Sequence, residues 1–151
     1  MKSVEEQLSR YKSVHFNKKN VQTHFIGVPL IVWAITLLLS LSSIDITLLG
    51  ITLKVTAAKV FFTIALLYYF KLHWRIALGM VLYIIPNVYF AEKVAAIDNA
   101  YLLAIIIFVI GWVIQFIGHY FEKAKPAFID DLSQFLIGPF FLMAEIYFAL
   151  G

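Results

Sequence analysis

The sequence predicts an all-α, multi-pass transmembrane helical bundle of about five spans, folded as one membrane-embedded domain over residues 1–151. Composition is the first observation: 62% of the residues are hydrophobic, 14% are charged, and the mean hydropathy is +0.89. A typical soluble domain is about half apolar and about a quarter charged. The second observation is a series of apolar runs that approach the roughly 20 residues a helix needs to cross a bilayer. The third is length, because 151 residues accommodate one domain.

Residues 2–14 predict a short amphipathic helix ahead of the first span. Val4, Leu8 and Tyr11 recur at helical spacing, with charged residues between them. This pattern is typical of a helix that lies in the membrane interface. A helix that packs against the bundle would show the same pattern, so both interpretations stay open.

Five apolar runs predict five membrane-spanning helices. The fourth run is the most clearly apolar, and the third contains Pro86, whose freed carbonyl must be satisfied by neighbouring helices. Several runs are short, so one pair could form a re-entrant hairpin in the membrane instead of two full crossings. The predicted spans cover residues 25–41, 57–70, 76–90, 101–118 and 134–150.

A small β-hairpin is predicted between the first two spans. Residues 44–48 and 51–55 alternate along the chain and are rich in β-branched side chains, with Leu49 and Gly50 between them. Alternation with period two around a glycine is typical of a hairpin. An extended cap over the bundle is the alternative.

Threading five spans through a bilayer places all four histidines on one side of the membrane. That side carries nine basic residues and the other side three, so the positive-inside rule predicts that the histidine side is cytoplasmic. The basic residues flank the apolar runs and form no long cluster, which indicates membrane lipid and not nucleic acid as the surroundings. The host membrane is then a bacterial inner membrane or an endoplasmic reticulum. The histidines are His15, His24, His73 and His119, the basic residues on their side are Lys2, Arg10, Lys12, Lys18, Lys19, Lys71, Arg75, Lys123 and Lys125, and those on the other side are Lys54, Lys59 and Lys93.

The first motif whose residues could bind a metal runs from His15 through Asn20 to His24 and continues to Gly27 and Pro29. On one unbroken helix, the two histidines would point in nearly opposite directions, because nine steps of about 100° leave them about half a turn out of phase. A helix break at an asparagine would let both imidazoles face one point, since asparagine is a good N-cap and turn residue. Asn17 and Asn20 are the candidates. The alternative is a pair of surface histidines at the level of the lipid headgroups.

The second motif places Gln115, His119 and Glu122 at positions i, i+4 and i+7, on one face of the helix that leaves the membrane. A histidine and a carboxylate one turn apart can bind the same metal ion, or the carboxylate can orient the imidazole. The alternative is an ordinary interfacial helix end with His119 as its polar terminus. The chain has no cysteine, so a metal site here would have nitrogen and oxygen ligands.

Two further polar residues stand out. Glu145 lies roughly 16 Å along the last helix from Gln134 if each residue rises about 1.5 Å. A carboxylate at that depth must face the bundle interior and find a partner, for which Asn87 is a candidate. We interpret Glu145 as structural or as a partner of metal ligands. His73 lies between basic residues in a short turn and is predicted to be an interfacial anchor more than a metal ligand.

The two histidine motifs together resemble those of the Mpo1-like family, a group of small multi-pass membrane proteins named for a fungal 2-hydroxy fatty acid dioxygenase. The resemblance covers essentially the whole chain, including the segment Gly138-Pro139-Phe140-Phe141 and Glu145. It implies an Fe(II)-dependent dioxygenase of fatty acid α-oxidation, which uses O2 to convert a 2-hydroxy fatty acid to the fatty acid that is one carbon shorter.

The resemblance also implies a set of site residues. His15, His24 and His119 carry over as the expected iron ligands. Asn20, Gln115 and Glu122 match the motifs and are predicted to be catalytic residues, with their individual roles left open. His73 is outside the pattern.

The residue types agree with this chemistry but leave alternatives. Nitrogen and oxygen ligands without sulfur suit non-haem Fe(II), and zinc would bind them as well. The carboxylate and hydroxyl of a 2-hydroxy acid suit a metal, and its chain would lie between the spans among apolar side chains. The alternative function is a small membrane transporter or metal-permeation protein without catalysis, with Glu145, Asn87 and the histidines along its pathway. A scaffold without chemistry is a third possibility.

Overall fold

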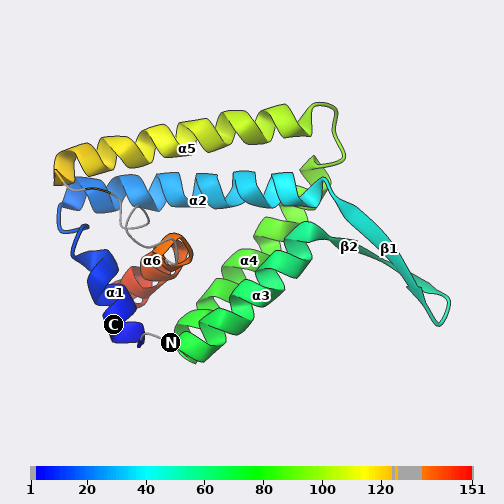
Figure 1. Cartoon of the computed structure of the whole chain (residues 1–151), viewed down its shortest axis with the longest axis horizontal. Coiled ribbons are helices and arrows are strands. Elements are labelled where there is room, and N and C mark those ends of the chain that lie inside the picture. Colours follow the sequence, from blue (N-terminus) through cyan, green and yellow to red (C-terminus); the bar gives the residue numbers. More distant parts are fainter. Residues whose placement is uncertain (1–2, 124, 126–133, 151) are drawn as a thin grey trace.

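The computed structural model describes residues 3–123, 125 and 134–150, and these residues form six helices and one two-stranded sheet. Figure 1 shows α2 and α5 side by side along the length of the molecule, with the paired helices α3 and α4 inclined against them. The hairpin projects from one end, and α1 lies at the other end. The elements are α1 (Val4–Lys12), α2 (Lys18–Ser40), β1 (Ser43–Leu48), β2 (Ile51–Thr56), α3 (Ala57–Leu72), α4 (Trp74–Val94), α5 (Ala100–Glu122) and α6 (Gln134–Leu150).

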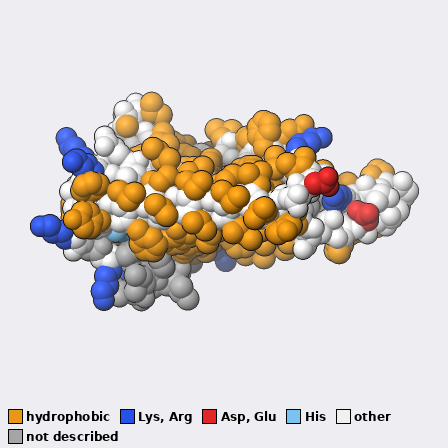
Figure 2. Space-filling view, turned by 90° about the horizontal axis from the view of Figure 1, so that it is seen from above, with side chains coloured by type: hydrophobic (Ala, Val, Ile, Leu, Met, Phe, Trp, Pro, Cys, Tyr) orange, Lys and Arg blue, Asp and Glu red, His pale blue; other side chains and the backbone are white. Residues whose placement is uncertain are grey.

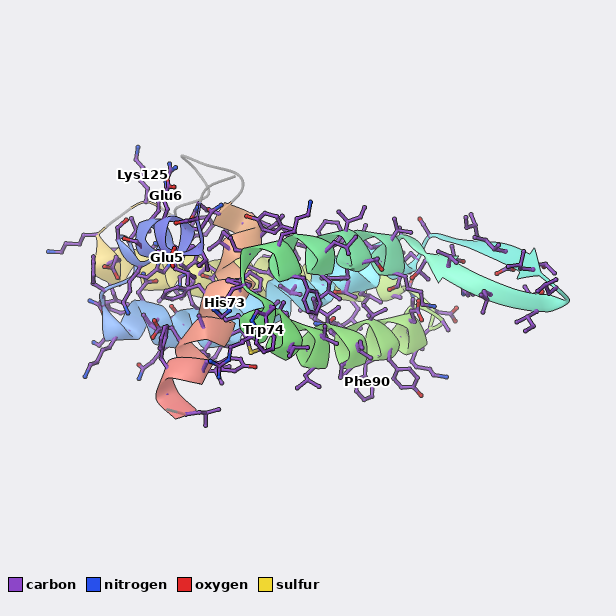
Figure 3. All side chains as sticks on the ribbon, turned by 90° about the horizontal axis from the view of Figure 1, so that it is seen from below. Glu5, Glu6, His73, Trp74, Phe90 and Lys125 are labelled. Carbon is purple, nitrogen blue, oxygen red and sulfur yellow. The ribbon has the colours of Figure 1, made fainter. Side chains whose placement is uncertain are left out.

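Three of the helices are long and apolar enough to cross a membrane: α2, α4 and α5, with 23, 21 and 23 residues. The helices α3 and α6 have 16 and 17 residues, fewer than the roughly 20 that a full crossing needs. Every predicted span therefore contains a helix, whereas the count of about five crossings stays a prediction. In Figure 3, α6 runs across α2, α3 and α4 instead of along them.

Glycines allow α2 and α5 to pack closely against each other. A Cβ atom added to Gly27 would lie 2.9 Å from the carbonyl oxygen of Gly111, and one added to Gly118 would collide with Thr23 and Asn20. Small residues at such positions let the backbones of membrane helices approach each other. The start of α2 is thereby held beside the last turns of α5, which brings the two histidine motifs to the same end of the molecule.

The predicted hairpin is present. Strands β1 and β2 pair in antiparallel fashion, with Ile44 opposite Val55 and Leu48 opposite Ile51. Leu49 and Gly50 form the turn with φ values of 51° and 80°, the left-handed geometry that favours glycine. The hairpin lies at the end of the molecule that is opposite α1 (Figure 1).

Helix α1 packs against the rest of the protein. Tyr11 and Gln7 are buried, with 6% and 4% of their surface exposed. The amide of Gln134 donates a hydrogen bond of 2.9 Å to Gln7, and Gln7 donates one of 3.2 Å to the hydroxyl of Tyr68. Packing against the bundle is therefore confirmed for this helix, and its additional contact with a membrane surface stays a prediction.

The outer surface is that of a protein surrounded by lipid. Figure 2 shows hydrophobic side chains in a continuous belt along the molecule, lysines and arginines at one end, and acidic and basic side chains together at the other. Ile106, Val109 and Val113 of α5 are each about half exposed. Together with the three long apolar helices, this surface agrees with the membrane protein that the composition predicts.

Candidate metal centre

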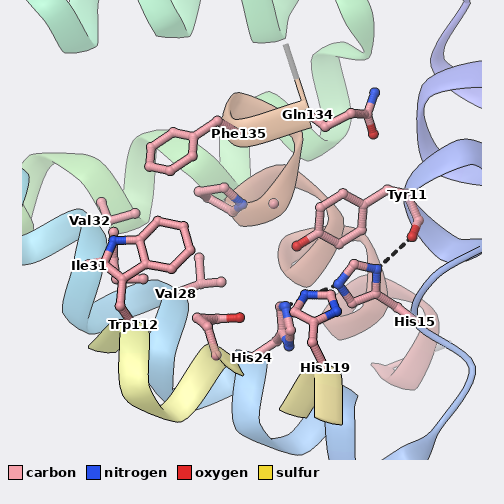
Figure 4. A pocket seen from close by; sticks show the side chains of 13 residues that line it. Tyr11, His15, His24, Val28, Ile31, Val32, Trp112, His119, Gln134 and Phe135 are labelled. Atoms are coloured by element: carbon pink, nitrogen blue, oxygen red, sulfur yellow. Dashed lines mark hydrogen bonds between the residues drawn. The ribbon is translucent and has the colours of Figure 1, made fainter. Parts of the chain in front are cut away.

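Three histidines from three different segments meet at one point. His15 lies in the loop before α2, His24 in the second turn of α2, and His119 near the end of α5. Each offers a ring nitrogen, and these atoms lie within 4.8 Å of one another. All three residues are buried, with 3%, 3% and 7% of their surface exposed. Figure 4 shows the three rings turned toward a common centre.

The bend that brings His15 to His24 is made by Asn17. This residue is the N-cap of α2, and its side-chain oxygen accepts a hydrogen bond of 2.9 Å from the backbone N–H of Lys19. Of the two asparagines that the sequence offers as a break, Asn17 is therefore the one at which the helix begins. The chain turns between Lys12 and Asn17, and this turn lets the two imidazoles face each other.

Backbone carbonyls fix the tautomers of two imidazoles. The Nδ1 atom of His15 lies 2.6 Å from the carbonyl oxygen of Tyr11, and that of His24 lies 2.8 Å from the carbonyl oxygen of Asn20. Because a carbonyl oxygen only accepts, each Nδ1 must carry the hydrogen, and each neutral ring then has its lone pair on Nε2. The two Nε2 atoms are 3.0 Å apart. Two lone pairs at this separation repel each other unless a proton or a metal ion lies between them.

Burial disfavours the proton. Desolvation lowers the pKa of His15, and this effect exceeds the opposing influence of the Tyr11 carbonyl and the Glu122 charge. Tyr11 stacks on His15 with ring centroids 4.1 Å apart, and burial raises the pKa of its phenol, so both rings are neutral near pH 7. Neutral imidazole is the form that binds metals.

Glu122 holds the loop that carries His15. Its Oε1 accepts a hydrogen bond of 2.9 Å from the backbone N–H of Phe16, and its Oε2 accepts one of 2.8 Å from that of Asn17. The side-chain amide of Asn20 donates a third, of 3.0 Å, to Oε2. The carboxylate therefore ties the end of α5 to the start of α2. Of the two roles the sequence allowed, this geometry favours orienting the ligands over direct ligation.

Asn20 and Gln115 also border the histidines. Asn20 is fully buried, and its amide donates a second hydrogen bond, of 3.2 Å, to the carbonyl of Val14. Gln115 is 4% exposed, and its Nε2 has no hydrogen-bond partner among the described residues. This nitrogen lies against α2, 2.7 Å from where a Cβ on Gly27 would stand. A buried polar group without a partner is costly.

A cavity adjoins the histidines between α1, α2, α5 and α6. The three imidazoles lie at one end, and Val32 and Phe135 lie on the side away from them (Figure 4); Gln115 and Gln134 also line the cavity. The apolar wall includes Val28, Ile31, Val32, Trp112 and Phe135. The arrangement suits a molecule with a polar head and a hydrocarbon tail.

His73 and Glu145 are not part of this site. His73 is the N-cap of α4, where its Nδ1 accepts a hydrogen bond of 3.4 Å from the N–H of Ile76 (Figure 3). Glu145 forms an ion pair of 3.2 Å with Lys12 and is 28% exposed. The expectation of a deeply buried carboxylate beside Asn87 is therefore wrong. Its physical cause is the direction of α6, which runs across the bundle and brings Glu145 back to α1.

The three imidazoles fit a metal ion. Two nitrogens that each lie about 2.1 Å from one metal, at right angles to each other, are about 3 Å apart. The Nε2 atoms of His15 and His24 have this separation, 3.0 Å. A site of imidazoles without sulfur is suited to iron and to zinc.

The part played by Tyr11 was not predicted from the sequence. Its ring covers one face of His15, and its carbonyl oxygen fixes the tautomer of the same residue. The signal was present, because Tyr11 precedes His15 by four positions, the spacing of neighbours on one helix face. Gln134, which is 1% exposed and lines the cavity, gave no comparable signal.

Comparison with known proteins gives two findings. The profile of the family described as "2-hydroxy-palmitic acid dioxygenase Mpo1-like" matches residues 1–150. The chain is also similar to a Saccharomyces cerevisiae protein named 2-hydroxy-palmitic acid dioxygenase MPO1. The two are 34% identical over 151 residues, which cover 98% of this chain and 82% of the yeast protein. No solved structure matches the chain.

Proposed function

We propose, from the premise that this chain belongs to the Mpo1-like family, that it is an Fe(II)-dependent dioxygenase acting on 2-hydroxy fatty acids. The product is the fatty acid that is one carbon shorter. The single observation that carries the proposal is the pair of Nε2 atoms, 3.0 Å apart, whose lone pairs face each other beside a third imidazole. The name of the yeast relative supports the substrate class.

The reaction balances without an external reductant. A 2-hydroxy acid and O2 give the shortened acid, CO2 and H2O. The bond between the carboxyl carbon and the hydroxyl-bearing carbon breaks, the carboxyl carbon leaves as CO2, and the hydroxyl-bearing carbon is oxidised to the new carboxyl group. The four electrons that the substrate loses are those that reduce O2.

His15, His24 and His119 would hold the iron. Fe(II) in such a site supplies the activation of O2, for which mononuclear oxygenases keep open positions beside their protein ligands. The carbonyls of Tyr11 and Asn20 hold two of the imidazoles in the tautomer that binds metal. Glu122 and Asn20 act as positioning residues, because they bind the loop and the helix turn that carry His15 and His24.

The chain's own polar groups would orient the substrate. Gln115 would hydrogen-bond the carboxylate or the hydroxyl, since its side chain lines the cavity beside the histidines. A surface groove reaches His15 from the other side and carries Lys18 beside the ion pair of Lys12 and Glu145. The charge of Lys18 attracts a carboxylate to this end of the molecule. The apolar part of the cavity excludes water from the hydrocarbon chain.

The same proposal places the protein in the membrane as one multi-pass domain over residues 1–151, with the histidine end on the cytoplasmic side. Among the described residues of the face in view, Figure 2 shows lysines and arginines without acidic neighbours at that end, whereas the basic side chains at the other end lie beside acidic ones; this asymmetry agrees with the positive-inside rule. A transporter has less support, because its pathway depended on Glu145 and Asn87. Glu145 pairs with Lys12, and Asn87 bonds to Tyr83.

Metal analysis and O2 uptake test the proposal together. The protein is purified in detergent, loaded with Fe(II) without oxygen, freed of excess metal, and given 2-hydroxypalmitate and O2. Wild type is expected to retain iron, consume O2 and release the shortened acid, whereas His24→Ala and His119→Ala do none of these. His73→Ala is the matched control and should behave as wild type. Equal O2 uptake in all four proteins would refute the ligand assignment, and no iron in wild type would refute the dioxygenase.

A further inference from the structure

A second cavity lies directly beside the one at the histidines. It lies between α2, α3, α4 and α6. Val32, Phe135 and Pro139 line both cavities, so the two cavities adjoin each other at these residues. Figure 4 shows Val32 and Phe135 on the side of the first cavity that is away from the histidines.

The second cavity is suited to a hydrocarbon chain. Its walls include Phe62, Ala65, Met80 and Ile84, all buried and apolar. Tyr69 also lines this cavity, but its hydroxyl already donates a hydrogen bond of 2.8 Å to a backbone carbonyl of α6. The cavity therefore offers contact to methylene groups and little to a polar ligand.

We propose that the two cavities form one channel for the acyl chain of the substrate, and that Phe62 and Ala65 set the length of chain it accepts. This inference rests on the proposed function. The polar head lies at the histidines and Gln115, which line the first cavity, and the tail passes Val32 and Phe135 into the second cavity.

Phe62 forms the end wall of this channel. It is 7% exposed and lines both the second cavity and a groove on the outer surface between α3 and α4. The groove reaches the ion pair of Lys59 and Glu92 at the hairpin end. Loss of the Phe62 ring would join the channel to this groove and let a longer chain extend toward lipid.

Ala65 controls the width of the same region. It lies three residues after Phe62 and so shares its face of α3, and it is 5% exposed. A leucine here would occupy the space of about three methylene groups. Each methylene that remains buried contributes about fourfold to the binding constant, so displacing three of them changes relative affinity on the order of 50-fold.

Competition among chain lengths tests the channel. Wild type and variants receive an equimolar mixture of saturated 2-hydroxy acids from decanoic to eicosanoic, and the shortened products are quantified. Phe62→Ala is expected to shift the product ratio toward long chains by about tenfold or more, and Ala65→Leu toward short chains on the order of 50-fold. Ile64→Ala, a change on the same helix at a side chain that is 62% exposed, is the control and should leave the ratio unchanged.

A binding measurement keeps the two proposals distinguishable. Metal-free wild type is irradiated with 2-hydroxy fatty acids that carry a diazirine near the head or near the tail. The channel predicts that the tail probe labels peptides of α3 and α4, that the head probe labels α2 and α5, and that Phe62→Ala moves the tail label outward to the groove. Unchanged ratios in both variants, or tail labelling confined to exposed side chains of α5, would overturn the channel even if wild type is active. Failure of wild type to convert any acid, with tail labelling in α3 and α4, would overturn the dioxygenase and leave the channel supported.

Discussion

Two glutamates at opposite ends of the molecule perform different tasks with the same carboxylate. Glu122 ends α5 at the histidine end and accepts hydrogen bonds from two backbone N–H groups and the amide of Asn20, all uncharged donors. Glu92 lies near the end of α4 at the hairpin end. It accepts a hydrogen bond of 2.7 Å from Thr56 and pairs at 3.0 Å with the charged Lys59.

The difference shows that the charge of a carboxylate acts on neighbouring groups only where its hydrogen-bond partners do not neutralise it. At Glu92 the charge is neutralised by Lys59, so the group fastens the base of the hairpin to α4. At Glu122 the donors are uncharged, and the negative charge acts on the neighbouring His15, where it favours a cation. We therefore expect changes at the histidine end to affect metal binding and changes at the hairpin end to affect local stability only.

Glu122→Gln is expected to have the largest effect. The glutamine side chain has only one acceptor oxygen, and its NH2 group would face N–H donors that bind the carboxylate in wild type. The loop that carries His15 would therefore lose part of its attachment to α5. We expect Fe(II) affinity to fall about 10- to 100-fold, measured by competition with a chelator. Glu122→Asp should recover part of this affinity. An unchanged affinity in the glutamine variant would remove Glu122 from the site.

Gly118→Ala tests the helix contact beneath the site. The added Cβ would lie 2.6 Å from the side-chain oxygen of Asn20, so α2 and α5 must separate where His24 and His119 meet. We expect a loss of about 1–3 kcal/mol in stability and weaker iron binding, measured by thermal unfolding in detergent and by chelator competition. Gly50→Ala is the control at the other end, where φ is +80° but nothing lies within 4 Å. It should cost about 1–2 kcal/mol in the hairpin and leave iron binding intact.

The pH dependence of stability is expected to follow His15. Burial holds its pKa below the ordinary value, so the unfolded chain takes up a proton near pH 6.5 that the folded protein does not. The metal-free protein should be most stable above this pH and lose stability as the pH falls, by at most about 1.4 kcal/mol per pH unit for this one group. His15→Asn should flatten the profile of thermal unfolding temperature against pH. An identical slope in both proteins would show that His15 is protonated in the fold.

Glu92→Gln is expected to have the smallest effect. The side chains of Lys59 and Glu92 are 43% and 25% exposed, and exposed ion pairs contribute about 0–1 kcal/mol. Iron affinity should equal that of wild type. A loss of iron in this variant comparable to that of Glu122→Gln would mean that the two ends are coupled and that the hairpin end also affects metal binding.

The sequence predicted the helices and the hairpin because their signals are local. Apolar runs gave every helix from α2 to α6, and alternation around Leu49 and Gly50 gave the hairpin. The direction of α6 could not be predicted, because an apolar run shows that a helix is buried but not which way it crosses its neighbours. Glu145 was misplaced for this reason.

The candidate site was predictable in its residues and not in its geometry. Same-face spacing grouped Gln115, His119 and Glu122, and an asparagine break was foreseen before His24. The hydrogen bonds that fix the tautomers are made by backbone carbonyls, which every residue carries, so no residue type marks them. The partners of Glu122 are likewise backbone N–H groups more than 100 positions away along the chain.

The three-histidine iron site is tested by X-ray absorption at the iron edge of the Fe(II)-loaded protein, with iron counted per chain in the same samples. We expect one iron per chain with scattering from three imidazole ligands, and the loss of bound iron in His15→Ala, His24→Ala and His119→Ala. Iron that is bound in wild type without imidazole scattering, or that persists unchanged in these three variants, would show that these histidines are not the iron ligands.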